Sequence, residues 1–113
     1  VFRYADVLLM HAEAAIMGAG GDGLGSLNQV IFRAYGNASH NLSSYTLADV
    51  KLQRRLELAT EGYDRFTDLV RWGDAASALA FKHYTVGRDE VLPIPQGEID
   101  LVGAGILTQN VGY

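Results

Sequence analysis

Apolar residues recur with helical spacing in the first third of the chain. Between residues 3 and 17, five of them fall on one face of a helix: Ala5, Leu8, Leu9, Ala12 and Ile16. Their i, i+3, i+4, i+7 pattern is typical of an amphipathic helix. A second helix is predicted over residues 24–35, with an apolar face formed by Leu27, Val30, Ile31 and Ala34. The glycine-rich residues 18–25 between them predict a helix end followed by a turn.

The middle of the chain predicts a longer helical segment. Residues 46–49 read TLAD, which resembles a capping box with Asp49 in place of the usual Glu and marks a helix start. The helix that follows carries an apolar stripe at i, i+4, i+7 and i+11, formed by Leu52, Leu56, Ala59 and Tyr63. Helix is predicted to continue over residues 63–72 and to end at Gly73. Its inward-facing residues are expected to be Phe66, Leu69 and Val70.

The last part of the chain has a different character. A short helix is predicted over residues 74–81 and a single helical turn over residues 98–102, and residues 108–113 are predicted to be irregular. Residues 91–95 read VLPIP and must be extended, because each proline fixes its own φ and disfavours helix at the residue before it. The predicted fold class is therefore all-α, with antiparallel helix pairs in a TPR-like arrangement and an extended C-terminal strap.

Composition narrows the class of protein. The chain has 113 residues, which suits one domain over residues 1–113, and 49% of its residues are hydrophobic, as in folded domains. The net charge of −4 provides no basic surface for nucleic acid, so no nucleic-acid partner is expected. The absence of cysteine excludes disulfides, thiolate metal sites and a cysteine nucleophile. The chain opens with Val1 and carries no signal peptide, so we expect a fragment of a longer protein.

Charged residues are dense from residue 54 to residue 71, and they allow two interpretations. Glu57 and Glu61 could form the acid and base pair of a glycoside hydrolase. We favour a structural ion-pair network, because a neighbouring arginine lowers a carboxyl pKa whereas an acid catalyst needs it raised. Helical spacing pairs Arg54 with Glu57, Glu61 with Arg65, and Asp68 with Arg71. Arg54 and Glu57 are also expected to pack against the first helix. The predicted network therefore consists of Arg3, Asp6, Arg54, Glu57, Glu61, Arg65, Asp68 and Arg71.

No cofactor or metal is expected from the remaining motifs. Residues 18–23 read GAGGDG and match G-x-G-x-x-G, but the dinucleotide fingerprint requires a strand before it, and here a helix is predicted. We therefore interpret these residues as a turn between helices. The three histidines, His11, His40 and His83, lack the spacing of metal ligands.

Aromatic residues near predicted loops are candidates for sugar contact. A sugar packs the apolar face of its ring on an aromatic side chain, while polar groups bind its hydroxyls. Tyr45 and Tyr84 lie near loops and are the predicted ligand-binding residues. Trp72 lies within the arginine-rich segment and is expected to pack between helices.

Three blocks of the sequence carry a resemblance to a known family. Residues 3–14 read RYADVLLMHAEA, residues 54–73 read RRLELATEGYDRFTDLVRWG, and LPIP at 92–95 precedes the closing QNVGY at 109–113. In this order and spacing they resemble the C-terminal part of SusD/RagB proteins. Residues 27–34 resemble a further helix of that family. Departures include Gln53, where the family usually has Glu, and Val111, where it has proline.

The resemblance implies a fold and a function. SusD/RagB proteins are nutrient-uptake lipoproteins at the outer-membrane surface of Bacteroidetes-type bacteria, and they serve polysaccharide utilisation. They bind glycans or other nutrients as partners of a SusC-like TonB-dependent transporter, on an all-α, TPR-like scaffold. The lipid anchor is expected in a part that precedes this chain, and most sugar-binding aromatics are expected outside it. The chain is thus expected to be no enzyme.

Two other functions remain open. The chain could be a helical protein–protein interaction module that contacts no sugar. It could also, as the less favoured alternative, be a glycoside hydrolase that uses Glu57 and Glu61. The three functions differ in what the chain does with glycan. A glycan-binding protein binds it, an interaction module binds a partner protein without it, and a hydrolase cleaves it.

Overall fold

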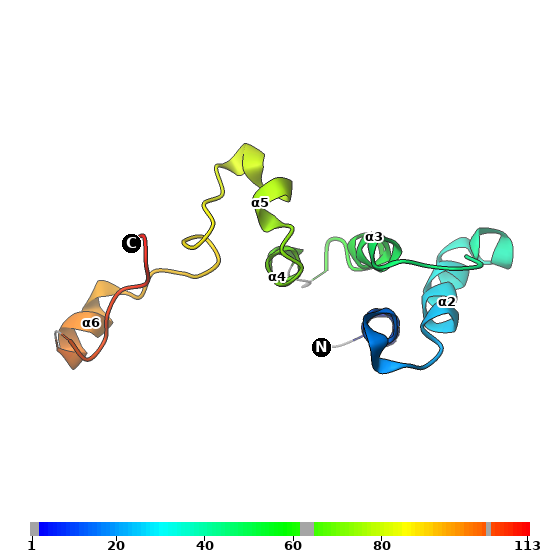
Figure 1. Ribbon diagram of the computed structural model, residues 1–113, viewed down its shortest axis with the longest axis horizontal. Coiled ribbons are helices and arrows are strands. Elements are labelled where there is room, and N and C mark those ends of the chain that lie inside the picture. The colour runs from blue at the N-terminus through cyan, green and yellow to red at the C-terminus, as the bar shows by residue number, and fades with distance from the viewer. Residues whose placement is uncertain (1–2, 62–64, 104) are drawn as a thin grey trace. The chain divides into compact units, whose positions relative to one another are not determined.

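The computed structural model describes residues 3–61, 65–103 and 105–113 (Figure 1). These residues form helices joined by turns and loops, and no strand occurs among them. The predicted all-α fold class is confirmed. The chain divides into two compact units, Val1–Tyr63 and Asp64–Tyr113, which are described in turn. In the described parts, no helix is both long and apolar enough to cross a membrane.

The first unit is built from three α-helices. They are α1 (Tyr4–Ala14), α2 (Gly23–Tyr35) and α3 (Leu47–Glu57), with a π-helical turn at Ala15–Ala19 and a 3-10 turn at Ala38–His40. Both α2 and α3 pack against α1, and the core between them is apolar. Its fully buried side chains are Leu9, Leu27, Val30 and Val50. The predicted capping box is confirmed, because Thr46 accepts from the Asp49 N–H while Asp49 accepts from the Thr46 N–H.

The glycine-rich segment forms the predicted turn between α1 and α2. Gly18, Gly20 and Gly21 all have positive φ, which other residues rarely adopt. Gly23 fills a different need, because a Cβ there would lie 2.0 Å from the Tyr45 hydroxyl oxygen. The turn therefore needs glycine both for its backbone conformation and for close packing.

Two residues predicted on the apolar faces are instead exposed. Ile16 was expected beside Leu9, but the π-helical turn that begins at Ala15 has a wider hydrogen-bond ring and moves Ile16 off the buried stripe. Ala34 is exposed because the buried part of α2 ends with Ile31. The predictions for Ile16 and Ala34 were wrong, whereas both helices were predicted within a few residues.

The buried face of α3 differs from the prediction. Leu52 and Leu56 are 51% and 60% exposed, while Val50 and Arg54 are buried. The expected stripe was wrong because ion pairs from α3 to α1 hold the helix with its Arg54 face inward, which turns the leucines outward. The stripe also fails at Ala59, which lies exposed in a turn after α3 has ended at Glu57. Tyr63 lies outside the described residues.

The second unit contains shorter helices. They are α4 (Arg65–Arg71), α5 (Ala75–Ala78), a 3-10 turn at Ala80–Lys82, and α6 (Gln96–Val102). Leu69 is buried as predicted, whereas Phe66 is 37% exposed rather than turned inward, and Val70 is half-buried. Gly73 has a φ of 74° and follows the end of α4, as predicted. The start predicted for this helix, at Tyr63, lies outside the described residues.

Residues 92–95 are not helical, as the prolines predict, and the end of the chain holds them. The Gln109 side chain accepts from the Ile94 N–H at 2.7 Å and donates to the Ile94 carbonyl at 2.8 Å. Asn110 donates to the Leu92 carbonyl at 2.7 Å, and the Tyr113 hydroxyl donates to the Val91 carbonyl at 3.0 Å. An extended segment has no internal backbone hydrogen bonds. The three side chains therefore supply partners for backbone N–H and carbonyl groups of residues 91–94.

Candidate functional site

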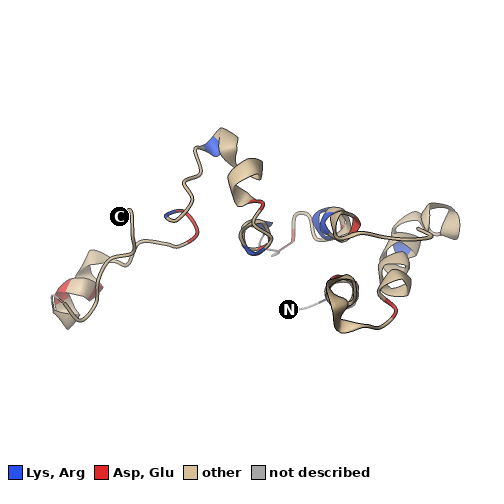
Figure 2. Cartoon of the chain, in the orientation of Figure 1, with Lys and Arg blue, Asp and Glu red and all other residues tan. Residues whose placement is uncertain are grey.

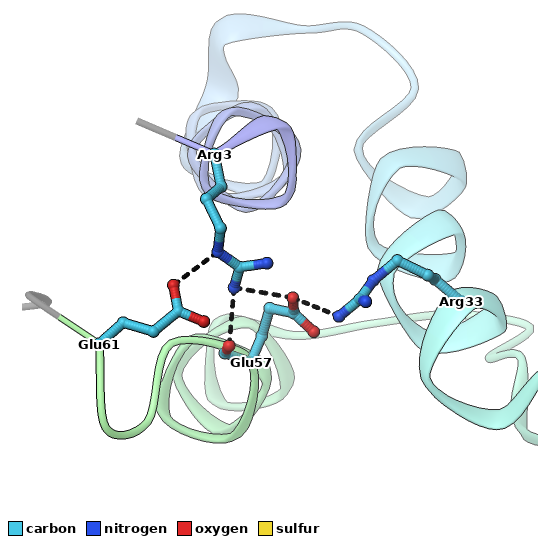
Figure 3. Close-up of polar contacts among 4 residues, drawn as sticks. All are labelled: Arg3, Arg33, Glu57 and Glu61. Atoms are coloured by element: carbon cyan, nitrogen blue, oxygen red, sulfur yellow. Dashed lines mark hydrogen bonds and ion pairs between the residues drawn. The ribbon is translucent and has the colours of Figure 1, made fainter. Parts of the chain in front are cut away.

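An arginine–carboxylate cluster joins the three helices of the first unit (Figure 3). Arg3 Nη2 lies 2.9 Å from Glu57 Oε1, and Arg3 Nε lies 2.6 Å from Glu61 Oε2. Arg33, from α2, reaches the same Glu57 oxygen at 2.5 Å. Arg3 also donates to the Glu57 backbone carbonyl at 2.8 Å, which fixes the end of α3 against the start of α1.

A second pair lies deeper in the same unit. Arg54 Nη1 donates to Asp6 Oδ1 at 3.0 Å, and the two side chains are only 7% and 17% exposed. In the other unit, Arg71 Nε pairs with Asp68 Oδ1 at 2.7 Å within α4. The structure thus brings five of the predicted network residues together in the first unit and two in the second. On α3 itself, Lys51, Arg54 and Arg55 lie between Asp49 near the start and Glu57 at the end, so the helix carries both signs of charge (Figure 2).

The electrostatics of Glu57 bear on its chemistry. Burial by itself would raise its pKa, but hydrogen bonds from Arg33 and Arg3 outweigh burial and hold the pKa below its ordinary value. The pKa of Arg3 is raised, chiefly by its hydrogen bond to Glu57. A general acid must carry a proton near neutral pH, and a carboxylate with a lowered pKa does not.

Tyr45 is the first of the two predicted sugar-contact residues. Its hydroxyl donates to the Ala12 carbonyl at 3.0 Å, and its ring packs against the core between α1 and α2. The ring is half-buried, and Gly23 approaches its hydroxyl closely. The ring is therefore accessible only in part, and its hydroxyl is bonded to the backbone of α1.

Tyr84 is the second, and it lies beside a cavity of about 390 Å³ in the second unit. Its half-buried ring meets Phe66 edge-on, with 6.2 Å between ring centroids. Partial burial, then the hydrogen bond to the Glu90 carboxylate, raise the pKa of Tyr84 to about 12. The hydroxyl therefore stays protonated at neutral pH and is a donor.

Two of the three histidines contact other side chains of the first unit. His11 Nδ1 lies 2.7 Å from the Ser26 hydroxyl, between α1 and α2. His40 stacks on Tyr35 with ring centroids 3.7 Å apart. Within the described ranges, no group of three or more His, Asp or Glu side chains could hold a metal ion.

Sequence reasoning missed Arg33 and placed Arg65 in an ion-pair network that the described residues do not show. Arg33 joins the Glu57 cluster, and Arg65 Nη1 is buried without a hydrogen-bond partner in the described structure. A signal existed for Arg33, since it follows the buried Val30 by three positions and a long side chain bordering a buried face can reach across it. Helical spacing suggested Glu61 for Arg65, but α3 ends at Glu57 and Glu61 accepts from Arg3.

One of three comparisons with known proteins finds a match. The family model described as SusD family matches residues 1–113, which is the whole chain. No curated protein matches the chain, and no solved structure does.

Proposed function

Because the chain belongs to the SusD family, we propose that it is part of a cell-surface protein that binds glycan and delivers it to a SusC-like TonB-dependent transporter. Proteins of this family are non-catalytic, glycan-binding, outer-membrane surface lipoproteins that work with SusC. The family match over residues 1–113 is the observation that carries the proposal. By the same reasoning, the whole protein resides at the outer-membrane surface through a lipid anchor.

The setting of the carboxylates supports binding rather than catalysis. Glu57 and Glu61, the residues of the hydrolase alternative, both accept from Arg3. A hydrolase would need a protonated carboxyl as its acid, and hydrogen bonds from Arg33 and Arg3 lower the pKa of Glu57 and favour its ionised form. Their distances instead suit a cluster that holds α1, α2 and α3 in register.

We keep Tyr84 and Tyr45 as proposed sugar contacts. Tyr84 offers a half-buried ring beside a cavity, and its hydroxyl already donates to Glu90, so the ring is the part that we propose contacts sugar. Tyr45 offers a half-buried ring whose hydroxyl is bonded to α1. Tyr84 is the better supported of the two.

Affinity electrophoresis of the chain in gels that contain single polysaccharides tests the proposal. We expect at least one glycan to retard the chain, and Tyr84→Ala to weaken that retardation more than Tyr35→Ala does. Tyr35 is the matched control, because it is an exposed tyrosine that stacks on His40. Binding to a SusC-like transporter without retardation by any glycan would favour the interaction-module alternative instead.

A further inference from the structure

The cavity beside Tyr84 has an apolar wall and a positively charged rim. Phe66, Leu69 and Leu79 form the wall, and Arg65 and Lys82 contribute cations to the rim. Its volume of about 390 Å³ lies in the range of about 300–1,000 Å³ that is typical of small-molecule sites. The cavity lies entirely within the second unit, between α4 and the segment that follows α5.

Two of its cations have no carboxylate partner among the described residues. Arg65 Nη1 is buried and makes no hydrogen bond. Lys82 forms no ion pair and lies only near the Phe81 ring, at 5.7 Å. Buried guanidinium nitrogens are almost always hydrogen-bonded in folded proteins. Because Arg65 also lines the cavity, an acceptor bound there would give its guanidinium the partner that the described residues do not supply.

The acid on the cavity rim does not neutralise these cations. Asp89 accepts from Arg88 Nε at 2.7 Å and from the Thr85 N–H at 2.6 Å. Arg88 therefore balances its charge. A second carboxylate, that of Glu90, accepts from Tyr84. The cations Arg65, Lys82 and Arg88 still exceed the carboxylates Asp89 and Glu90 by one charge, which a neutral ligand would leave uncompensated.

From this arrangement we infer that the cavity binds a sugar unit that carries an anionic group, with Arg65 and Lys82 on the anion and the rings of Tyr84 and Phe66 against the sugar. The inference rests on the proposed function, because it names the glycan class that the chain would take. Arg65 supplies directional N–H donors that suit carboxylate and sulfate oxygens. The apolar wall suits the C–H face of the sugar ring.

Calorimetric titration of the whole chain with trigalacturonate and with its fully methyl-esterified form tests the inference. Esterification removes the charge and keeps the sugar backbone. We expect the acidic form to bind at least about tenfold more tightly than the ester. A sulfated neutral trisaccharide distinguishes the two anions: tight binding of it in place of trigalacturonate identifies sulfate as the anion.

Variants locate the site. Arg65→Gln and Lys82→Gln should each weaken binding of the acidic trisaccharide by about tenfold and leave the ester unaffected. Arg55→Gln is the control, because it removes the same charge from an exposed residue that does not line the cavity. Lys82 is exposed and should tolerate substitution even if Arg65→Gln proves unstable.

The inference would be overturned if the chain bound trigalacturonate and its ester with equal affinity. It would also be overturned if Lys82→Gln and a folded Arg65→Gln both bound trigalacturonate as tightly as the original chain. If the chain binds neutral glycans only, the inference fails and the proposed function stands. If it binds no glycan of any charge, the proposed function fails as well.

Discussion

Replacement of Glu57 by glutamine tests the arginine–carboxylate cluster most sharply. The Glu57 side chain is only 5% exposed, and it accepts from Arg3 and Arg33. Glutamine keeps the shape and one acceptor oxygen but removes the negative charge. Arg33 would then face a neutral group and Arg3 would keep its ion pair with Glu61 alone, so the change should destabilise the first unit.

The magnitude follows from the exposure of the partners. A hydrogen bond to a buried charged group contributes about 1.5–3 kcal/mol, whereas an exposed ion pair contributes about 0.2–1 kcal/mol. Arg3 is 36% exposed and Arg33 is 63% exposed, so each contact with Glu57 falls between these limits. We expect Glu57→Gln to lower the free energy of unfolding by about 1–2 kcal/mol.

The effect should depend on pH, with a definite sign. The pKa of Glu57 is lower in the fold than its ordinary value of 4.5. Its contribution is therefore fully present above pH 4.5 and is lost as the pH falls through the lowered folded pKa. The stability difference between the original chain and Glu57→Gln should be constant near neutral pH and should shrink below pH 4.5.

Urea unfolding followed by circular dichroism, at several pH values, measures this difference. Glu98→Gln is the matched control: Glu98 is exposed on α6, and its change should stay within about 0.5 kcal/mol. A Glu57→Gln chain as stable as the original at pH 7, or a difference that grows on acidification, would refute the reasoning.

Four other substitutions have outcomes set by local geometry. Gly23→Ala should lower the free energy of unfolding by about 1–3 kcal/mol, because the added methyl group would lie 2.0 Å from the Tyr45 hydroxyl oxygen. Gly97→Ala has open space in α6 and should raise the free energy of unfolding by up to about 1 kcal/mol. Urea unfolding measures both. Gln109→Ala should speed hydrogen exchange of the Ile94 amide about tenfold by NMR, because that amide loses its acceptor, and unchanged exchange would contradict this role. Thr46→Ala should cost about 1 kcal/mol in thermal or urea unfolding through loss of the capping box, and a neutral result would contradict it.

Local signals predicted most of the helices. The apolar spacing around Leu9 and Leu27, and the capping box at Thr46, each act within a few residues, and the structure follows them. The prolines of residues 91–95 likewise dictate an extended segment. These features depend on backbone preference and on one helical face, which a sequence displays directly.

The rotation of α3 was predicted only in part, because Arg54 was expected to pack against the first helix but Leu52 and Leu56 were expected on a buried face as well. Leu52 and Leu56 make the more apolar stripe, yet Arg54 faces inward because Asp6, which is 48 residues away in sequence, accepts from it. A partner at that distance does not appear in the periodicity of the helix itself. Long-range ion pairs therefore outweighed local hydrophobicity at this position.

The candidate site likewise combines a feature predicted from local sequence with features that depend on residues from separate elements. Tyr84 was predicted from its position near a loop, but the cavity beside it depends on Arg65 and Lys82 from separate elements. Helical spacing assigned Arg65 a partner at Glu61, and the end of α3 at Glu57 removed the basis for that pairing. An unpaired buried donor becomes visible only once all of its neighbours have been placed.

The central claim is that the chain binds glycan and does not cleave it. The most direct measurement incubates the chain with each polysaccharide that retards it in a gel and then quantifies the reducing ends released. The account predicts retardation with no reducing ends above those of a heat-denatured control. Release of reducing ends that Glu57→Gln abolishes would contradict it.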